Sequence, residues 1–301
     1  MAFQVISEWR TKFIQEAAMA IRTVTVIGAG VLGIQIALQT ARHGFDVIAQ
    51  DISDEALAKA REALDAIAAQ MQADLKLGTM TSPPPARARL SLTTDLAQAV
   101  ANADLVIEAV PENPQIKRDL YARLAPLMKD GAILATNSST LLPSELAGAT
   151  AQPDCFLALH FANHIWRHNI AEIMGHPGTD PAVRDEVQAF AKAIGMVPIV
   201  LEKEQPGYVL NSLLVPFLQA AAALLVDGVT APQDVDKVWR IATGAPLGPF
   251  QIYDIVGLNT AWHISSAGGP KAQEFARLLK RDFLDKGKLG VASGAGFYTY
   301  S

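Results

Sequence analysis

Two side chains, His160 and Glu172, stand in neighbouring predicted strands at 156–160 and 171–174 and form a candidate acid–base pair. Histidine is the usual base for a hydroxyl proton because its unperturbed pKa lies near neutrality. A carboxylate on the other ring nitrogen fixes the tautomer and stabilises the imidazolium. Such a pair suits a dehydrogenase, and the alternative is a histidine that simply packs at a strand end.

Other polar side chains follow the predicted strands at the point where each strand ends. In chain order they are Glu112, Asn137, Ser138, Ser139 and Asn163. In a doubly wound sheet the ligand lies beyond the carboxyl ends of the strands, so we expect these groups to converge there. The two serines could instead cap a helix that begins near Leu142.

The stretch from Thr23 to Asp51 predicts a cofactor site. A β-branched run ends at a glycine-rich turn, an apolar stretch of helical spacing follows, and a second strand ends at Asp51. Gly28 allows the tight turn, Gly30 the close approach of a pyrophosphate, and Gly33 close packing of helix and strand. The helix N-terminus attracts phosphate, while the Asp51 carboxylate accepts bonds from ribose hydroxyls and repels a 2′-phosphate. These features predict NAD as the cofactor.

The rest of the chain must position these residues. Strands and helices alternate up to about residue 202, which predicts an α/β fold with a doubly wound, Rossmann-type NAD-binding domain at 21–202. Beyond it we predict an all-helical C-terminal domain at 203–301. Its predicted helices are 209–226, 232–243, 250–265 and 270–286. Residues 1–20 form an amphipathic N-terminal extension, to which we assign no function.

Composition narrows the class of protein. The 301 residues carry a net charge of −5 and no basic run, so a nucleic acid is not an expected partner. The apolar helix at 209–226 contains Asn211, Pro216 and Gln219, so we expect its own domain or a second subunit to bury it, and no membrane span. The single cysteine, Cys155, fits a reducing compartment, which we expect to be the cytoplasm. The spacing of cysteine and histidine residues predicts no metal site.

Beyond these single residues, a series of motifs occurs in a fixed order. They are Gly-Ala-Gly-Val-Leu-Gly at 28–33, Glu108 to Asn113 with Lys117, Asn137-Ser138-Ser139, His160-Phe161-Ala162-Asn163, Glu172, Pro206 to Asn211, Gly248-Pro249-Phe250, Asp254 to Leu258, and Gly294 to Tyr298. This series resembles the L-3-hydroxyacyl-CoA dehydrogenase family, in particular its 3-hydroxybutyryl-CoA dehydrogenases, over residues 21–300. An ordered series is far more specific than any one of its motifs.

The resemblance implies NAD-dependent oxidation of a short-chain L-3-hydroxyacyl-CoA to the 3-oxoacyl-CoA, or the reverse, by a homodimer formed through the C-terminal domain. By position, His160 matches the general base and Glu172 its carboxylate partner. Ser139 and Asn211 match the groups that hold the substrate oxygen, and Asn163 the group that orients the acyl chain. The implied cofactor contacts are Asp51, Glu112, Lys117 and Asn137.

One segment departs from the family pattern. Ala162 stands where a bulky residue is usual, and His164-Ile165-Trp166 stands where proline is usual. His160 and Asn163 keep their spacing, so we expect the chemistry to survive while Trp166 and His168 reshape the acyl side of the pocket. Two other functions therefore stay open: a dehydrogenase for a free 3-hydroxy acid of the sugar-acid or carnitine type, and a non-catalytic NADH-binding protein.

Overall fold

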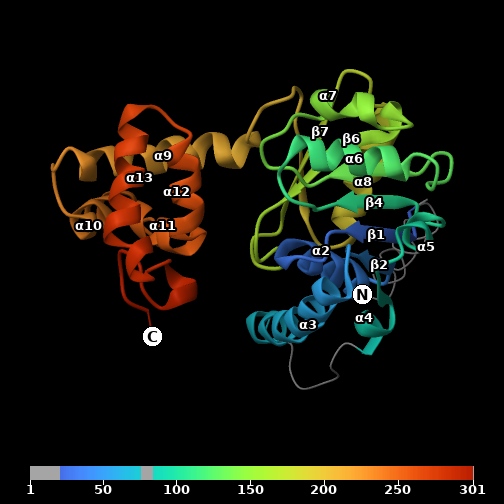
Figure 1. The fold of residues 1–301 in the computed structure, drawn as a ribbon, viewed down its shortest axis with the longest axis horizontal. Helices are drawn as coiled ribbons and strands as arrows, with labels where there is room; N and C mark the ends of the chain where they lie inside the picture. Colours follow the sequence, from blue (N-terminus) through green and yellow to red (C-terminus); the bar gives the residue numbers. More distant parts are fainter. Residues whose placement is uncertain (1–20, 76–83, 301) are drawn as a thin grey trace, which may run out of the picture. The chain divides into compact units, whose positions relative to one another are not determined.

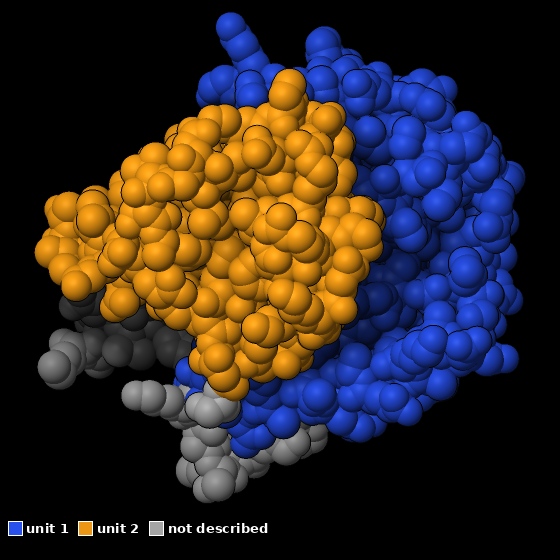
Figure 2. Space-filling model, turned by 60° about the vertical axis from the view of Figure 1, so that its left-hand side comes forward, with its two compact units in different colours: residues 1–208 blue, residues 209–301 orange. Residues whose placement is uncertain are grey.

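The computed structural model describes residues 21–75 and 84–300. The chain divides into two compact units, Met1–Tyr208 and Val209–Ser301, which Figure 2 shows in blue and orange. The predicted N-terminal extension at 1–20 lies outside the described residues.

The first unit is built on one eight-stranded sheet with the strand order β3-β2-β1-β4-β5-β6-β7-β8 (Figure 1). The neighbours pair in parallel except for β6 and β7, which are antiparallel. The predicted α/β doubly wound class is thereby confirmed. The strands are β1 (Thr23–Ile27), β2 (Asp46–Gln50), β3 (Leu90–Thr93), β4 (Leu105–Glu108), β5 (Ile133–Thr136), β6 (Phe156–Phe161), β7 (Ile170–Gly175) and β8 (Val197–Val200).

Helices cover both faces of this sheet because successive strand side chains point to opposite faces. Val24 and Val26 of β1 belong to a core shared with α2, α3 and α8. Ile27 belongs to a second core shared with α5 and α6. The helices are α2 (Val31–Arg42), α3 (Asp54–Asp74), α4 (Pro84–Ala88), α5 (Leu96–Val100), α6 (Pro114–Leu124), α7 (Pro143–Leu146) and α8 (Pro181–Ala193).

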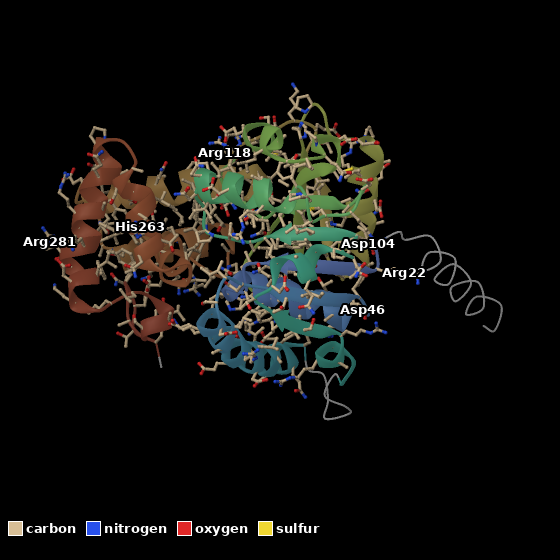
Figure 3. All side chains as sticks on the ribbon, turned by 45° about the vertical axis from the view of Figure 1, so that its right-hand side comes forward. Arg22, Asp46, Asp104, Arg118, His263 and Arg281 are labelled. Carbon is tan, nitrogen blue, oxygen red and sulfur yellow. The ribbon has the colours of Figure 1, made fainter. Side chains whose placement is uncertain are left out.

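Short polar side chains set where these helices begin. The Ser53 hydroxyl accepts a hydrogen bond from the backbone N–H of Ala56 at the start of α3. Asn113 caps α6, which begins with Pro114. These bonds satisfy N–H groups that have no partner within the helix. At the amino edge of the sheet, Asp104 Oδ2 accepts the N–H groups of Arg22 and Thr23 at 2.8 Å each, which anchors the start of β1 (Figure 3).

The second unit consists of α9 (Tyr208–Val226), whose first residue closes the first unit, and of α10 (Pro232–Thr243), α11 (Pro249–Val256), α12 (Leu258–Ser266) and α13 (Pro270–Asp282). The single helix predicted at 250–265 is wrong, because the helix breaks at Gly257, whose φ is +93°. Such a φ is left-handed and ends a right-handed helix. The helix predicted at 270–286 likewise ends at Asp282 and continues as a short 3₁₀ turn, Leu284–Lys286.

Two buried carboxylates hold the second unit together. Asp236 accepts the N–H groups of Phe250 and Gln251, so it caps the start of α11. Asp254 accepts the N–H groups of Phe297 and Tyr298 at 2.9 Å each, so it fastens the C-terminal segment. Each carboxylate also accepts a tyrosine hydroxyl at 2.8 Å, from Tyr298 at Asp236 and from Tyr300 at Asp254.

Helix α9 is only partly covered by the residues that the structure describes. Leu218, Ala221 and Ala222 belong to the core of the second unit. By length and composition alone α9 could span a membrane, and only 17% of its most apolar 18-residue window, of mean hydropathy 2.0, is buried. The sequence led us to expect that its own domain or a second subunit buries this helix. Its own domain therefore buries only a part of it.

Candidate active site

The glycine-rich turn between β1 and α2 has the geometry that a dinucleotide requires. Gly28 has a φ of +96°, and a Cβ there would lie 2.6 Å from the carbonyl oxygen of Ala109. A Cβ on Gly33 would lie 1.8 Å from the carbonyl oxygen of Gly28. A Cβ on Gly30, by contrast, would meet nothing within 4 Å. Gly30 therefore leaves a gap in front of the N-terminus of α2, where a pyrophosphate fits.

Asp51 follows β2 and braces this turn. Its Oδ2 accepts the N–H of Ala29 at 2.8 Å, and its Oδ1 accepts the N–H of Ile52 at 2.7 Å. A carboxylate oxygen has two lone pairs, so both oxygens can still accept ribose hydroxyls. The position fits the predicted contact with the adenosine ribose.

We expect an Asp51→Ser variant to lose discrimination between the two nicotinamide cofactors. The change removes the charge that repels a 2′-phosphate and one acceptor for the ribose hydroxyls. The ratio of the NADH and NADPH dissociation constants, measured by cofactor fluorescence, should move by about tenfold or more toward NADPH. Ser53→Ala, which removes a nearby helix cap only, is the control. An unchanged ratio in the Asp51 variant would rule out the ribose role.

His160 and Glu172 face each other on β6 and β7, where the strand register pairs them directly. The Nδ1 of His160 lies 3.0 Å from Oε2 of Glu172. The carboxylate can only accept, so Nδ1 carries the proton and Nε2 presents its lone pair. The Oγ of Ser139 lies 3.2 Å from this Nε2. The side chains of Ser139, His160 and Glu172 thus form one hydrogen-bonded network.

This hydrogen-bonded network is largely shielded from water. His160 is 5% exposed and Glu172 is 2% exposed. A buried imidazole that takes up a proton needs a buried anion beside it, and Glu172 supplies that anion. The predicted pairing of the two side chains is what the structure shows, whereas the catalytic role of each stays a prediction.

Glu112 organises the turn that carries Ser139. Its Oε1 accepts the hydroxyls of Ser138 and Thr140 and the N–H groups of Ser139 and Thr140 at 2.6–3.0 Å. Burial alone would raise the pKa of Glu112, but the bonds from Ser138 and Thr140 and the charge of Lys117 outweigh it and lower the pKa. The alternative role of the two serines as caps of a helix near Leu142 is wrong, because the N-cap residue of α7 is Leu142 itself. Ser138 does accept the N–H of Leu141, but the Ser139 hydroxyl turns to His160.

Lys117 forms a buried ion pair with Glu108, a residue to which the sequence reading gave no role. The Lys117 Nζ lies 2.6 Å from Oε1 of Glu108, and the lysine is 1% exposed. Glu108 also accepts the hydroxyls of Tyr121 and Thr136. The signal in the sequence was Glu108 itself, an acidic residue in the otherwise apolar strand 105–108. A buried carboxylate needs partners such as this lysine and these hydroxyls. The cofactor contact of Lys117 stays a prediction.

The three predicted asparagines lie in different surroundings. Asn137 follows β5, and its Oδ1 accepts the N–H of Phe161 at 3.0 Å, which ties the ends of β5 and β6 together. Asn163 is exposed in the loop after β6. Asn211 belongs to the second unit, on α9. Their contacts with cofactor or substrate stay predictions.

The loop after β6 is anchored to two helices of the first unit. The N–H of His164 donates to Oε1 of Gln35 on α2 at 2.7 Å. The indole N–H of Trp166 donates to Oδ2 of Asp74, the last residue of α3, at 2.7 Å, and Arg167 pairs with the other oxygen. Trp166 is 6% exposed, so what the structure shows is a buried anchor. Its predicted effect on the acyl pocket stays a prediction.

No role was predicted for Tyr208, although it lies within the motif at 206–211. It is fully buried, and its ring stacks on the imidazole of His160 with the ring centres 4.5 Å apart and the planes at 9°. No local pattern in the sequence marks this contact.

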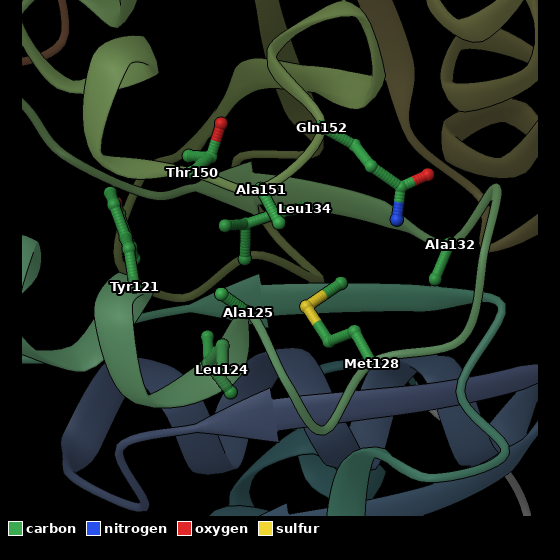
Figure 4. A pocket seen from close by; sticks show the side chains of 9 residues that line it. All are labelled: Tyr121, Leu124, Ala125, Met128, Ala132, Leu134, Thr150, Ala151 and Gln152. Atoms are coloured by element: carbon green, nitrogen blue, oxygen red, sulfur yellow. The ribbon is translucent and has the colours of Figure 1, made fainter.

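A small cavity lies elsewhere in the first unit, among α6, β5 and the segment 150–152 (Figure 4). Its volume is about 20 Å³, room for a single water molecule. None of the predicted site residues lines it, so it plays no part in the site described above.

The histidine, carboxylate and serine lie at the same edge of the sheet as the glycine-rich turn, because β1, β4, β5 and β6 run parallel. Together they define an NAD-dependent dehydrogenase.

Comparisons with known proteins agree with this class. The family model described as 3-hydroxyacyl-CoA dehydrogenase, NAD binding domain, matches residues 23–205, and the model of the C-terminal domain matches residues 207–300. The mitochondrial hydroxyacyl-coenzyme A dehydrogenase of Homo sapiens is 34% identical over 291 residues, covering 93% of this chain and 91% of that protein. The chain therefore belongs to the 3-hydroxyacyl-CoA dehydrogenase family.

Two solved structures resemble this chain over nearly its whole length. A structure described as showing substrate-directed dual catalysis of dicarbonyl compounds by diketoreductase is 57% identical, with a TM-score of 0.89, over 93% of this chain and 99% of that one. The (S)-3-hydroxybutyryl-CoA dehydrogenase from Ralstonia eutropha is 30% identical, with a TM-score of 0.80, over 94% of this chain and 100% of that one.

Proposed function

We propose that the chain interconverts a short-chain L-3-hydroxyacyl-CoA and its 3-oxoacyl-CoA with NAD as cofactor. The observation that carries the proposal is the connected set of Ser139, His160 and Glu172 in the domain that holds the glycine-rich turn. The names of relatives, 3-hydroxybutyryl-CoA dehydrogenases, support a substrate with a short acyl group.

The side chains divide the work of the oxidation. NAD, when bound, supplies the acceptor for the hydride that leaves C3. The Nε2 of His160 takes the proton of the substrate hydroxyl, while Glu172 stabilises the imidazolium through Nδ1. The Ser139 hydroxyl, which lies beside Nε2, donates a hydrogen bond to the oxygen that becomes the carbonyl. In the reduction the imidazolium returns the proton to that oxygen.

A second candidate function is the reduction of a dicarbonyl compound that lacks coenzyme A. The 57% identity to the diketoreductase favours it. The two candidates share their reacting part, because a 3-oxoacyl thioester is itself a dicarbonyl compound: a ketone two bonds from a thioester carbonyl. They differ only in whether the nucleotide end of coenzyme A contributes to binding.

Loss of NADH absorbance, measured with acetoacetyl-CoA, free acetoacetate and pentane-2,4-dione in parallel, separates the candidates. We expect the thioester to give the highest kcat/KM. A higher kcat/KM for the dione would establish the second candidate, and turnover of acetoacetate alone would establish a free hydroxy-acid dehydrogenase. NADH binding without oxidation by any of the three would contradict both candidates and favour a binding protein.

We also propose that the chain forms a homodimer through the second unit. Leu213 on α9 is 70% exposed and Ile241 on α10 is 76% exposed. The rings of Phe217 and Trp239, on the same two helices, lie 4.6 Å apart, so these apolar residues belong to adjoining faces. Large exposed apolar patches usually mark interaction sites, and a second copy would cover this one.

An Ile241→Glu variant should sediment with the mass of one chain, whereas the parent sediments with twice that mass. A buried, unpaired carboxylate at a dimer interface weakens association by about several kcal/mol. Val197→Glu places the same charge on an exposed apolar residue of the first unit and should leave the dimer intact. A monomeric parent would overturn the proposal.

A reducing compartment, the cytoplasm, is the location that we propose. Cys155 is the only cysteine, and it is free. Burial, followed by the nearby negative charges of Asp154, Asp180 and Glu186, raises the pKa of its thiol, which keeps the thiol protonated and unreactive. Cell fractionation with an antibody against the chain tests this location.

A further inference from the structure

Tyr208 is a buried aromatic residue that the mechanism above does not use. It is the first residue of α9 and the last residue of the first unit, and it is fully shielded from water. Its φ is +53°, a left-handed conformation that non-glycine residues rarely adopt. Strain of this kind persists only where surrounding contacts impose it, and it gathers at functional sites.

The ring of Tyr208 fixes the imidazole of His160 from a direction that no hydrogen bond covers. The two rings are nearly parallel, at 9°, with their centres 4.5 Å apart. Glu172 and Ser139 contact the two nitrogen-bearing edges of the imidazole, whereas Tyr208 covers one face. Rotation of the imidazole out of this plane would break all three contacts. The electron-rich face of the tyrosine ring also suits the cation that forms when His160 takes up a proton.

The hydroxyl of Tyr208 holds the backbone that carries Ser139. It donates a hydrogen bond of 2.7 Å to the carbonyl oxygen of Ser138. That oxygen and the N–H of Ser139 belong to one planar peptide group. The N–H end of the same group donates to Glu112 at 3.0 Å. Both ends of the peptide before Ser139 are therefore held, which fixes the backbone on that side of Ser139.

The hydroxyl keeps its donor role at all working pH values. Burial, followed by the negative charges of Glu112, Glu172 and Glu108, raises the pKa of Tyr208 well above its ordinary range. A neutral tyrosine is the form that can donate to a carbonyl oxygen.

We propose that Tyr208 is a positioning residue of the active site, whose ring holds the imidazole of His160 and whose hydroxyl holds the peptide that carries Ser139. The inference rests on the proposed function for its kinetic consequences. It goes beyond that function because it makes the geometry of both reacting groups depend on one side chain.

Two variants separate the two contacts. Tyr208→Leu removes both ring and hydroxyl, and we expect kcat to fall by about 10- to 100-fold, because small misplacements of catalytic groups have effects of this size. The KM for NADH should stay within about twofold, since the cofactor turn is untouched. Tyr208→Phe keeps the stack and loses only the hydrogen bond, so kcat should fall by a few-fold only, about 2- to 10-fold.

Tyr298→Phe is the matched control, because it also removes a tyrosine hydroxyl that donates to a partner at 2.8 Å, but in the second unit. It should leave kcat at the parent value. A folded Tyr208→Leu variant with parent kcat, or a control that loses as much activity as Tyr208→Phe, would overturn the proposal. If the leucine variant fails to fold, the phenylalanine variant decides the hydroxyl's role by the same comparison.

A spectroscopic experiment tests the ring contact without any substrate. The chain has six histidines, so ring-labelled histidine gives few signals in a ¹H–¹³C correlation spectrum. The His160 signal is the one missing from a His160→Gln variant, and stacking on a tyrosine shifts it upfield. That shift should vanish in Tyr208→Leu and persist in Tyr208→Phe. Its persistence in the leucine variant would refute the stack, whereas parent protein that is inactive with every dicarbonyl substrate refutes the proposed function instead.

Discussion

His160→Gln should lower kcat for acetoacetyl-CoA reduction by about 10²-fold or more, the usual effect of removing a general acid–base group. Glutamine can still contact Glu172 and Ser139, but it cannot carry the proton between the substrate oxygen and the protein. NADH binding, measured by fluorescence titration, should stay at the parent value because the glycine-rich turn is unchanged. The variant thus separates cofactor binding from proton transfer.

His176→Gln is the control for this experiment. His176 lies in the same unit, but its Nε2 contacts the carbonyl oxygen of Pro153 at 2.8 Å and no predicted site residue. It should keep parent kcat. A His160→Gln variant with turnover close to the parent value would remove His160 from the mechanism, and the stacked Tyr208 would then have only a structural role.

The largest stability effect is expected at Asp254, which holds the C-terminal segment. Asp254→Ala leaves the buried N–H of Phe297, the partly buried N–H of Tyr298 and the hydroxyl of Tyr300 without an acceptor. Each unsatisfied buried group costs about 1–3 kcal/mol, so the free energy of unfolding should fall by about 3 kcal/mol or more. Urea unfolding followed by circular dichroism measures the change.

Tyr300→Phe isolates one of these three bonds and should cost about 1 kcal/mol. The same carboxylate explains the last motif of the sequence, because a Cβ on Gly296 would lie 2.0 Å from Oδ1 of Asp254. Gly296→Ala should therefore destabilise the chain although it deletes no contact. Equal stability of the Asp254 variant and the parent would show that these bonds contribute nothing to the stability of the fold.

The fold was predictable because its signals are local. Apolar strands, helix caps and the glycine-rich turn each occupy a few consecutive residues, and the helix that begins at Pro114 behind Asn113 is an example. Gly257 shows the limit of such signals. Glycine occurs inside helices as well as at their ends, and only the left-handed φ at this position decides which case applies.

The site was predictable where strand order decides it and not where the chain returns from a distance. His160 and Glu172 lie on adjacent strands, so their pairing follows from the sheet. Tyr208 reaches Ser138 across 70 residues of sequence, and no periodicity reports such a contact. Trp166 is a second example, because no local pattern pairs its indole N–H with the Asp74 carboxylate 92 residues earlier.

The antiparallel pairing of β6 with β7 separates two parts of the enzyme that can change independently. The register of the ladder, and not the connecting loop, sets His160 opposite Glu172. Residues 162–169 can therefore differ in length and composition without disturbing the pairing of the histidine with the carboxylate. Relatives that share this pair can diverge in that loop, and new substrate preferences can evolve there while the geometry of the pair stays the same.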